Sequence, residues 1–127
     1  RMAIAKALHL PAVSFLEAFH RAGLTTRAAM ESGSIARASR ESEPNRAVKS
    51  PPALQHRYVY EDVGYGLVPM AALGRLAQVP TPAMDALITL AELALGAELR
   101  ESGLTLAKMG LAGKTVAELP QFLERGG

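Results

Sequence analysis

An arginine and two acidic residues stand close together in the segment from Arg57 to Met70, where glycines and a proline constrain the backbone. Arg57 carries a planar guanidinium that can donate two parallel hydrogen bonds to a carboxylate. Asp62 carries a carboxylate that can orient an imidazole and favour its charged form. These two groups suit the recognition of an organic acid and the support of a proton-transferring histidine. Arg57 and Asp62 are therefore the residues of this segment that could take part in a site of that kind.

Two neighbours, Glu61 and Tyr65, are candidates for lining the same pocket. On an uninterrupted helix Arg57 and Asp62 would diverge by roughly 140°. They can serve one pocket only if the segment bends or enters the pocket end-on, and the flexible residue Gly64 permits that. A plainer alternative stays open, in which Asp62 caps the following helix and Arg57 pairs with Glu61 at helical spacing.

Other kinds of site fit the sequence poorly. Gly64 and Gly66 lack the third glycine and the preceding strand of a dinucleotide-binding loop. His9, His20 and His56 do not have metal-ligand spacing, and a chain without cysteine has no thiolate metal site. We therefore expect no metal site, and we expect His56 to be structural or solvent-exposed rather than catalytic.

The composition favours an all-α fold. The 127 residues, of which 49% are hydrophobic, are enough for one domain with its own core. Alanine and leucine are common, whereas valine, isoleucine and aromatic residues are few, which favours helix over strand. The formal net charge is only +2 and the charged residues are spread along the chain, so we expect no nucleic-acid partner. We predict a single helical domain over residues 1–127.

We also expect no membrane partner. The most apolar run, from Ala83 to Leu95, contains two acidic residues and is too short to span a bilayer. The first residues lack the apolar core and the cleavage site of a signal peptide. The absence of cysteine suits the cytoplasm, where we expect the protein to act.

Helical spacing and turn residues predict the elements of the first half of the chain. Thr25 and Thr26 are candidate caps for a short polar helix, and Gly23 ends the helix before it. The predicted elements are helices over residues 1–10, 12–21 and 26–30, a weaker extension over 32–40 and a long loop over 41–54.

The second half is expected to contain the central helix of the domain. A helix starts near Leu67, with Pro69 in its first turn, and ends by Val79. Thr81 then caps a helix that has Pro82 at its first position. This helix, over about residues 82–95, is apolar on nearly every face, so we predict that it is buried.

Glycines and caps also define the remaining elements. Gly96 ends the apolar helix, and Thr105 caps a short helix that ends at Gly110. Thr115 and the glutamate three residues later form a capping-box pattern for a last helix, which Pro120 should kink or shorten.

Several of these segments closely resemble the C-terminal helical domain of the octopine/nopaline (opine) dehydrogenase family. The resemblance covers nearly the whole chain, and its central motif is long and mixed in residue type. The matching segments are Arg57-Tyr58-x-x-Glu61-Asp62-Val63-x-Tyr65-Gly66-Leu67-Val68-Pro69, Val79-Pro80-Thr81-Pro82, Met2-Ala3-Ile4-Ala5-Lys6-Ala7-Leu8, Ala47-Val48-Lys49-Ser50-Pro51, Gly103-Leu104-Thr105-Leu106 and Met109-Gly110-Leu111-Ala112-Gly113.

The resemblance implies a two-domain enzyme that condenses a 2-keto acid reductively with an amino acid or amine. An N-terminal Rossmann domain would bind NAD or NADP, and this helical domain would close over it. Asp62 matches the aspartate that partners a catalytic histidine, and Arg57 matches an arginine that binds the keto-acid carboxylate. The family's histidine belongs to a segment with a His-Pro pair, and this chain contains no such pair.

The chain begins with Arg1 and an uncapped helical pattern, so we expect it to be the C-terminal part of a longer protein. Alone it should be inactive, because the resemblance assigns hydride transfer to the nucleotide-binding domain. A different class of function stays open, namely a free-standing helical interaction or dimerisation module. The apolar face of its central helix would then promote a homodimer.

Overall fold

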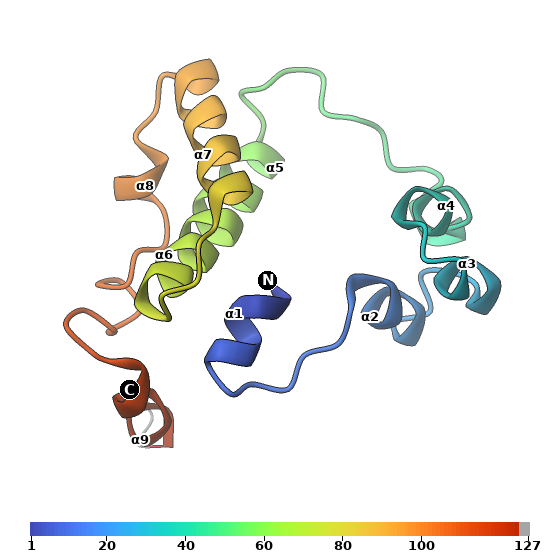
Figure 1. Cartoon of the computed structure of the whole chain (residues 1–127). Helices are drawn as coiled ribbons and strands as arrows, with labels where there is room; N and C mark the ends of the chain where they lie inside the picture. The colour runs from blue at the N-terminus through green and yellow to red at the C-terminus, as the bar shows by residue number, and fades with distance from the viewer. Residues whose placement is uncertain (125–127) are drawn as a thin grey trace. The chain divides into compact units, whose positions relative to one another are not determined.

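The computed structural model describes residues 1–124, and within these residues every regular element is a helix (Figure 1). This confirms the all-α prediction. The chain divides into two compact units. The larger unit consists of Arg1, Ala3–Leu10 and the residues from Pro51 onward, and the smaller unit consists chiefly of Pro11–Ser50. The expectation of one domain over residues 1–127 stays a prediction.

The larger unit is built around a helical stretch that continues without a break from Arg57 to Leu76. Helix α7 packs beside this stretch, as Figure 1 shows. The elements of this unit are α1 (Met2–Ala7), α5 (Arg57–Tyr60), the π-helix η2 (Glu61–Leu67), α6 (Val68–Leu76), α7 (Pro82–Leu95), α8 (Leu99–Ser102), the 3₁₀ helix η3 (Val116–Glu118) and α9 (Leu119–Glu124).

A small apolar core joins the long helical stretch to α7 and α8. Its members are aliphatic and almost entirely removed from water. The burial of apolar surface is the main favourable term in folding. They are Val63, Val68, Ala71, Ile88 and Leu99.

The predicted helix over residues 82–95 has the expected bounds, and Gly96 ends it in the left-handed conformation with φ = 62°. The prediction that this helix is buried was wrong. Ile88 is 1% exposed, but Leu87, Leu90 and Leu93 are 53%, 63% and 77% exposed. The helix packs on one face only: Met84, Ala91 and Leu95 lie against the core beside Ile88, and the three exposed leucines lie on the other side.

The helix caps predicted for the second half of the chain are found in part. The hydroxyl of Thr81 donates to Oδ2 of Asp85 at 2.9 Å instead of accepting from the backbone. Residues 106–110 form turns rather than a helix. The capping box of Thr115 and Glu118 is present, and its hydrogen bonds from Thr115 lower the pKa of the Glu118 carboxyl. Pro120 lies at the second position of α9, where a proline is tolerated.

Three short helices of the smaller unit are each capped by a hydroxyl group. Ser14, Thr26 and Ser34 accept hydrogen bonds from backbone N–H groups three residues later, at 3.1 to 3.2 Å. Gly33, with φ = 71°, separates the last two helices, so residues 35–40 form a helix of their own rather than an extension. The elements of this unit are α2 (Phe15–Arg21), α3 (Arg27–Glu31), α4 (Ile35–Arg40) and the 3₁₀ helix η1 (Glu43–Asn45), which lies within the predicted loop.

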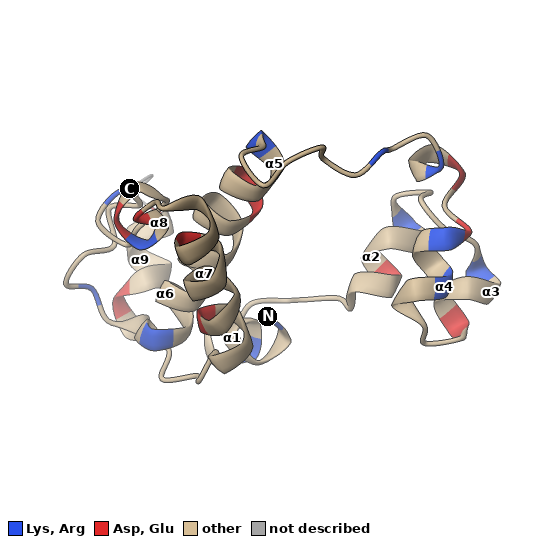
Figure 2. Cartoon of the chain, turned by 90° about the horizontal axis from the view of Figure 1, so that it is seen from above, with Lys and Arg blue, Asp and Glu red and all other residues tan. Residues whose placement is uncertain are grey.

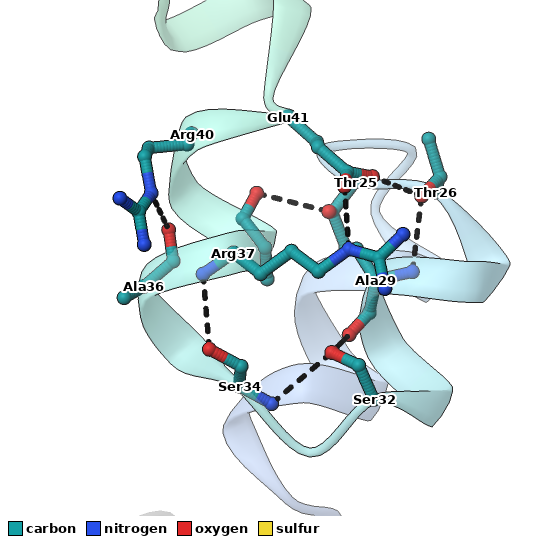
Figure 3. A network of polar contacts seen from close by, with 10 residues as sticks. Thr25, Thr26, Ala29, Ser32, Ser34, Ala36, Arg37, Arg40 and Glu41 are labelled. Carbon is teal, nitrogen blue, oxygen red and sulfur yellow. Dashed lines mark hydrogen bonds and ion pairs between the residues drawn. The ribbon is translucent and has the colours of Figure 1, made fainter.

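A carboxylate links the start of α3 to the end of α4 (Figure 3). Nε of Arg37 donates to one oxygen of Glu41 at 2.6 Å, and the hydroxyl of Thr26 donates to the other at 2.8 Å. The Thr25 hydroxyl adds a bond of 2.9 Å to the carbonyl of Ala38. The Arg37 bond, and then the Thr26 bond, lower the pKa of the Glu41 carboxyl.

We predict that Glu41→Gln makes the unfolding of the smaller unit less sensitive to acid. The pKa of Glu41 is lower in the folded chain than in the unfolded chain. Its stabilisation is therefore complete above the ordinary glutamate range and is lost as the pH falls through the lowered value. Native-state hydrogen exchange of α3 and α4 between neutral pH and the acid range would measure this. Glu43→Gln, which removes an exposed ion pair with Arg46, is the matched control. An acid response of Glu41→Gln equal to that of the control would contradict the assignment.

Candidate functional site

The central motif folds as a π-turn, in which each hydrogen bond spans one residue more than in an α-helix. The N–H of Val68 donates to the carbonyl of Val63, five residues back. The next residue in this register is Pro69, which has no N–H to donate. The carbonyl of Gly64 therefore has no helical donor, although Gly64 is buried.

A distant backbone group satisfies this carbonyl. The N–H of Leu104 donates to the oxygen of Gly64 at 2.9 Å. The contact requires glycine at 103, because a Cβ added there would lie 2.3 Å from the Gly64 oxygen and 2.6 Å from the Leu99 oxygen. The π-turn is thus bound to the loop after α8 by a single close backbone contact.

A lysine holds that loop in place. Nζ of Lys108 donates to three successive carbonyls, those of Glu101, Ser102 and Gly103, at 3.2, 2.5 and 2.8 Å. These carbonyls lie at the C-terminal end of α8, where a positive charge is favourable. The Lys108 contacts therefore fix the residues that deliver the Leu104 N–H.

The start of α5 is fixed by a histidine. Nδ1 of His56 accepts a hydrogen bond from the backbone N–H of Tyr58 at 3.2 Å, and the two rings meet edge to face with centroids 4.5 Å apart. His56 therefore serves as an N-terminal cap of α5. This agrees with the prediction of a structural role.

All four predicted site residues, Arg57, Glu61, Asp62 and Tyr65, are exposed. Arg57 lies 3.8 Å from Glu61, the ion pair of the plainer alternative, and its guanidinium is 5.6 Å from the centre of the Tyr58 ring. Figure 2 shows this basic start of α5 and the acidic residues that follow it.

Asp62 does not cap the following helix, because it lies inside the continuous helical stretch. Its neighbour Val63 points into the core, so the two side chains leave the π-turn in different directions. Within residues 1–124 the Asp62 carboxylate has no hydrogen bond or ion pair with another residue, and the structure forms no ion pair between it and Arg57. An exposed, unpartnered carboxylate is available to a group from outside this part of the chain.

The exposed ion pair between Arg57 and Glu61 is weak, so either side chain can exchange its partner. Its side chains are 73% and 57% exposed, and ion pairs of this kind are weak because water competes for both charges. A substrate carboxylate could replace Glu61 as the partner of the guanidinium. The arrangement can therefore support anion recognition at Arg57 and orientation of an imidazole at Asp62.

Sequence reasoning missed the residues that shape the site from a distance, namely Gly103, Leu104 and Lys108. The sequence contained one indication of such a contact. Pro69, five residues after Gly64, cannot donate the hydrogen bond that a π-turn would need, so the Gly64 carbonyl requires a donor from elsewhere. The lysine contacts had no such signal, since its side chain reaches three backbone carbonyls that any residue types could supply.

Comparison with known proteins decides the family. The family model described as NAD/NADP octopine/nopaline dehydrogenase, alpha-helical domain, matches residues 1–95. The chain belongs to this family. An opine dehydrogenase from Arthrobacter sp. (strain 1C) is 36% identical over 124 residues, which cover 98% of this chain. These residues are 33% of the relative, so the chain spans about a third of that protein's length.

Two further findings concern this octopine/nopaline dehydrogenase domain. No helix within residues 1–124 is long and apolar enough to cross a membrane. The same residues contain no group of three or more histidine, cysteine, aspartate or glutamate side chains that could hold a metal ion.

We predict that Gly103→Ala lowers the free energy of unfolding by roughly 3 kcal/mol, because the added methyl group overlaps the Gly64 carbonyl. The backbone of Gly103, with φ = −69° and ψ = −167°, suits alanine, so the loss comes from crowding alone. Urea unfolding followed by circular dichroism measures it.

Gly66→Ala is the matched control within the π-turn. A Cβ at this position would lie 4.0 Å from the carbonyl oxygen of Glu61, which is an ordinary contact. We expect the control to change the free energy of unfolding by less than about 1 kcal/mol. Equal losses in the two variants would show that the contact between Gly64 and the α8 loop does not shape the π-turn.

Proposed function

We propose that this chain is the substrate-binding helical part of an NAD(P)-dependent enzyme that condenses a 2-keto acid reductively with an amino acid or amine. Family membership and the opine dehydrogenase relative support the reaction class. The observation that carries the site assignment is the exposed carboxylate of Asp62, which has no partner within residues 1–124 and stands on a π-turn held from behind by Leu104.

In this proposal Asp62 orients a histidine contributed by another part of the full-length protein. An ionised carboxylate beside an imidazole fixes its tautomer and favours its protonated form, so the histidine can give a proton and take it back near neutral pH. An exposed position suits this role, because the histidine has to approach from outside.

Arg57 binds the carboxylate of the keto acid in this proposal. The guanidinium leaves Glu61 and forms two parallel hydrogen bonds with the substrate. Glu61 and Tyr65 line the same surface, where the glutamate keeps the arginine extended before substrate arrives and the phenol provides a polar edge.

The described residues do not fit a nucleotide-binding site. The carbonyl of Gly64 is engaged by Leu104, and Gly66 lies inside a helix rather than in an open phosphate-binding loop. NAD or NADP would therefore be bound mainly outside residues 1–124, where it would supply the hydride. The chain without that region should be inactive, and we propose that the full-length protein acts in the cytoplasm.

We predict that Asp62→Asn in the full-length protein lowers kcat by roughly 10²- to 10⁴-fold, because the histidine loses the charge that orients it. The apparent pKa of that histidine, read from the pH dependence of kcat/KM, should also fall, since the protonated form loses its anion. Glu61→Gln is the matched control one residue away and should leave the pH profile in place. A kcat for Asp62→Asn close to that of the parent protein would contradict the catalytic role.

We predict that Arg57→Met chiefly raises KM for the keto acid, by roughly 10- to 100-fold, because two charge-assisted hydrogen bonds are lost. Methionine keeps an unbranched apolar stem and removes the guanidinium donors. KM for the amino acid or amine should change much less, so initial rates with each substrate varied in turn separate the two effects. An unchanged KM for the keto acid would remove Arg57 from the substrate site.

A further inference from the structure

His56 holds the first turn of the helical stretch that carries Arg57. Its ring nitrogen Nδ1 accepts the N–H of Tyr58 at 3.2 Å, and its carbonyl accepts the N–H groups of Val59 and Tyr60 at 3.0 and 3.3 Å. The N–H groups at the start of a helix have no acceptor earlier in the helix, so the capping residue has to supply it. A single residue therefore provides the acceptors for three N–H groups around the candidate substrate-binding arginine.

The same histidine fixes the ring on which the guanidinium rests. The rings of His56 and Tyr58 meet edge to face, with centroids 4.5 Å apart and an angle of 68° between their planes. The guanidinium carbon of Arg57 lies 5.6 Å from the centre of the Tyr58 ring, within the range of a cation–π contact. His56 is half-buried, whereas Arg57 and Tyr58 are exposed. The orientation of the guanidinium therefore depends on the Tyr58 ring, and the orientation of that ring depends on His56.

The contact with the Tyr58 N–H requires a neutral imidazole. Nδ1 can accept a hydrogen bond only while it carries no proton, so the proton of the neutral ring is on Nε2. A second proton, which imidazoles gain between about pH 5 and 8, would turn Nδ1 into a donor that faces another donor. It would also place a positive charge at the N-terminal end of a helix and next to a guanidinium, and both positions are unfavourable for a cation.

No carboxylate bound to the ring offsets such a charge. The groups beside His56 on its own helix are the phenol of Tyr58 and the guanidinium of Arg57, and Arg57 pairs with Glu61 at 3.8 Å. Helix α5 is in contact with η2, whose titratable residues are Glu61, Asp62 and Tyr65. Within residues 1–124 none of these groups forms a hydrogen bond or ion pair with the His56 ring. The neutral form is therefore the one that suits its surroundings.

We propose that neutral His56 is a positioning residue for Arg57, so that the protein binds the keto-acid carboxylate more weakly once this histidine is protonated. The inference rests on the role proposed above for Arg57. While the cap is in place, the guanidinium is held in one orientation and loses little freedom when a carboxylate binds. Protonation of His56 releases the first turn, and the substrate then has to order Arg57 itself. The charge of an imidazolium alone would attract the substrate anion, so the sign of the pH effect separates positioning from simple attraction.

The KM for the keto acid, measured in the full-length protein at saturating amine, tests the proposal. His56→Asn is the reference, because asparagine caps a helix well and does not titrate. The KM of the parent relative to that of His56→Asn should rise roughly fivefold from about pH 8 to about pH 5.5, in line with the typical worth of a cap. The catalytic histidine is common to both proteins, so the ratio isolates His56. A ratio that stays constant, or that falls toward acid pH, would overturn the proposal.

Two further variants control for folding and for histidine content. His20→Asn should follow the parent at every pH, although His20 is also half-buried and bonded through Nδ1, to the carbonyl of Thr25 at 3.1 Å. His56→Ala, which cannot cap, should have the raised KM even at about pH 8. Circular dichroism shows whether each variant is folded. A folded His56→Ala variant with the parent's KM at that pH would also overturn the proposal.

The tautomer of His56 can be measured without any activity. Nitrogen-15 NMR of the full-length protein, with the His56 signal identified by its loss in His56→Asn, should show the proton on Nε2 at about pH 8. A proton on Nδ1 at that pH would overturn the proposal. Arg57→Met separates this inference from the proposed function. If Arg57→Met raises KM while the ratio between parent and His56→Asn stays constant, only the positioning role fails, whereas an unchanged KM in Arg57→Met overturns both.

Discussion

The hydrogen bond from the Leu104 N–H to the Gly64 carbonyl is the contact on which the geometry of the larger unit depends. It exists because Pro69 withholds the donor that the helix would otherwise provide, and a buried carbonyl without a donor is costly. The loop after α8 supplies the donor, which brings residues 40 positions apart in the sequence into contact. The π-turn, the loop and the core residues Val63 and Leu99 are therefore one cooperative assembly. The candidate site residues stand on its outer surface.

Much of the local structure could be predicted from short-range signals. Thr26 and the Thr115–Glu118 pair cap the helices expected of them, and Gly96 ends α7 at the predicted residue. These signals are reliable because a cap or a left-handed glycine acts within a few residues, so no knowledge of the tertiary fold is needed. The family resemblance of the Arg57–Pro69 run was likewise readable, and the comparisons confirm it.

Sequence reasoning failed for two features that depend on tertiary contacts, the burial of α7 and the π-turn. An apolar helix was expected to be buried, but the number of faces that α7 buries depends on how many partners surround it, and only the side around Ile88 has them. The π register was also beyond local reasoning, because glycines at 64 and 66 are compatible with a bend, a loop or a wide turn. The wide turn forms because Leu104 completes its hydrogen bonds. The pairing of Arg57 with Glu61, by contrast, followed from spacing alone and was one of the alternatives considered.

The π-turn has one more consequence, for insertions and deletions in this protein. A turn of this width takes up one additional residue while the helix on its N-terminal side keeps nearly the same angular position relative to α6. Deleting a single residue between 61 and 67 would let this segment close as an ordinary α-helix, and the rotation lost with one residue would be largely offset by the larger rotation of about 100° for each remaining residue. The wide turn therefore keeps the guanidinium of Arg57 pointing in nearly the same direction whether or not the additional residue is present. Homologues whose motif is one residue shorter would still present the arginine to the same side of the molecule.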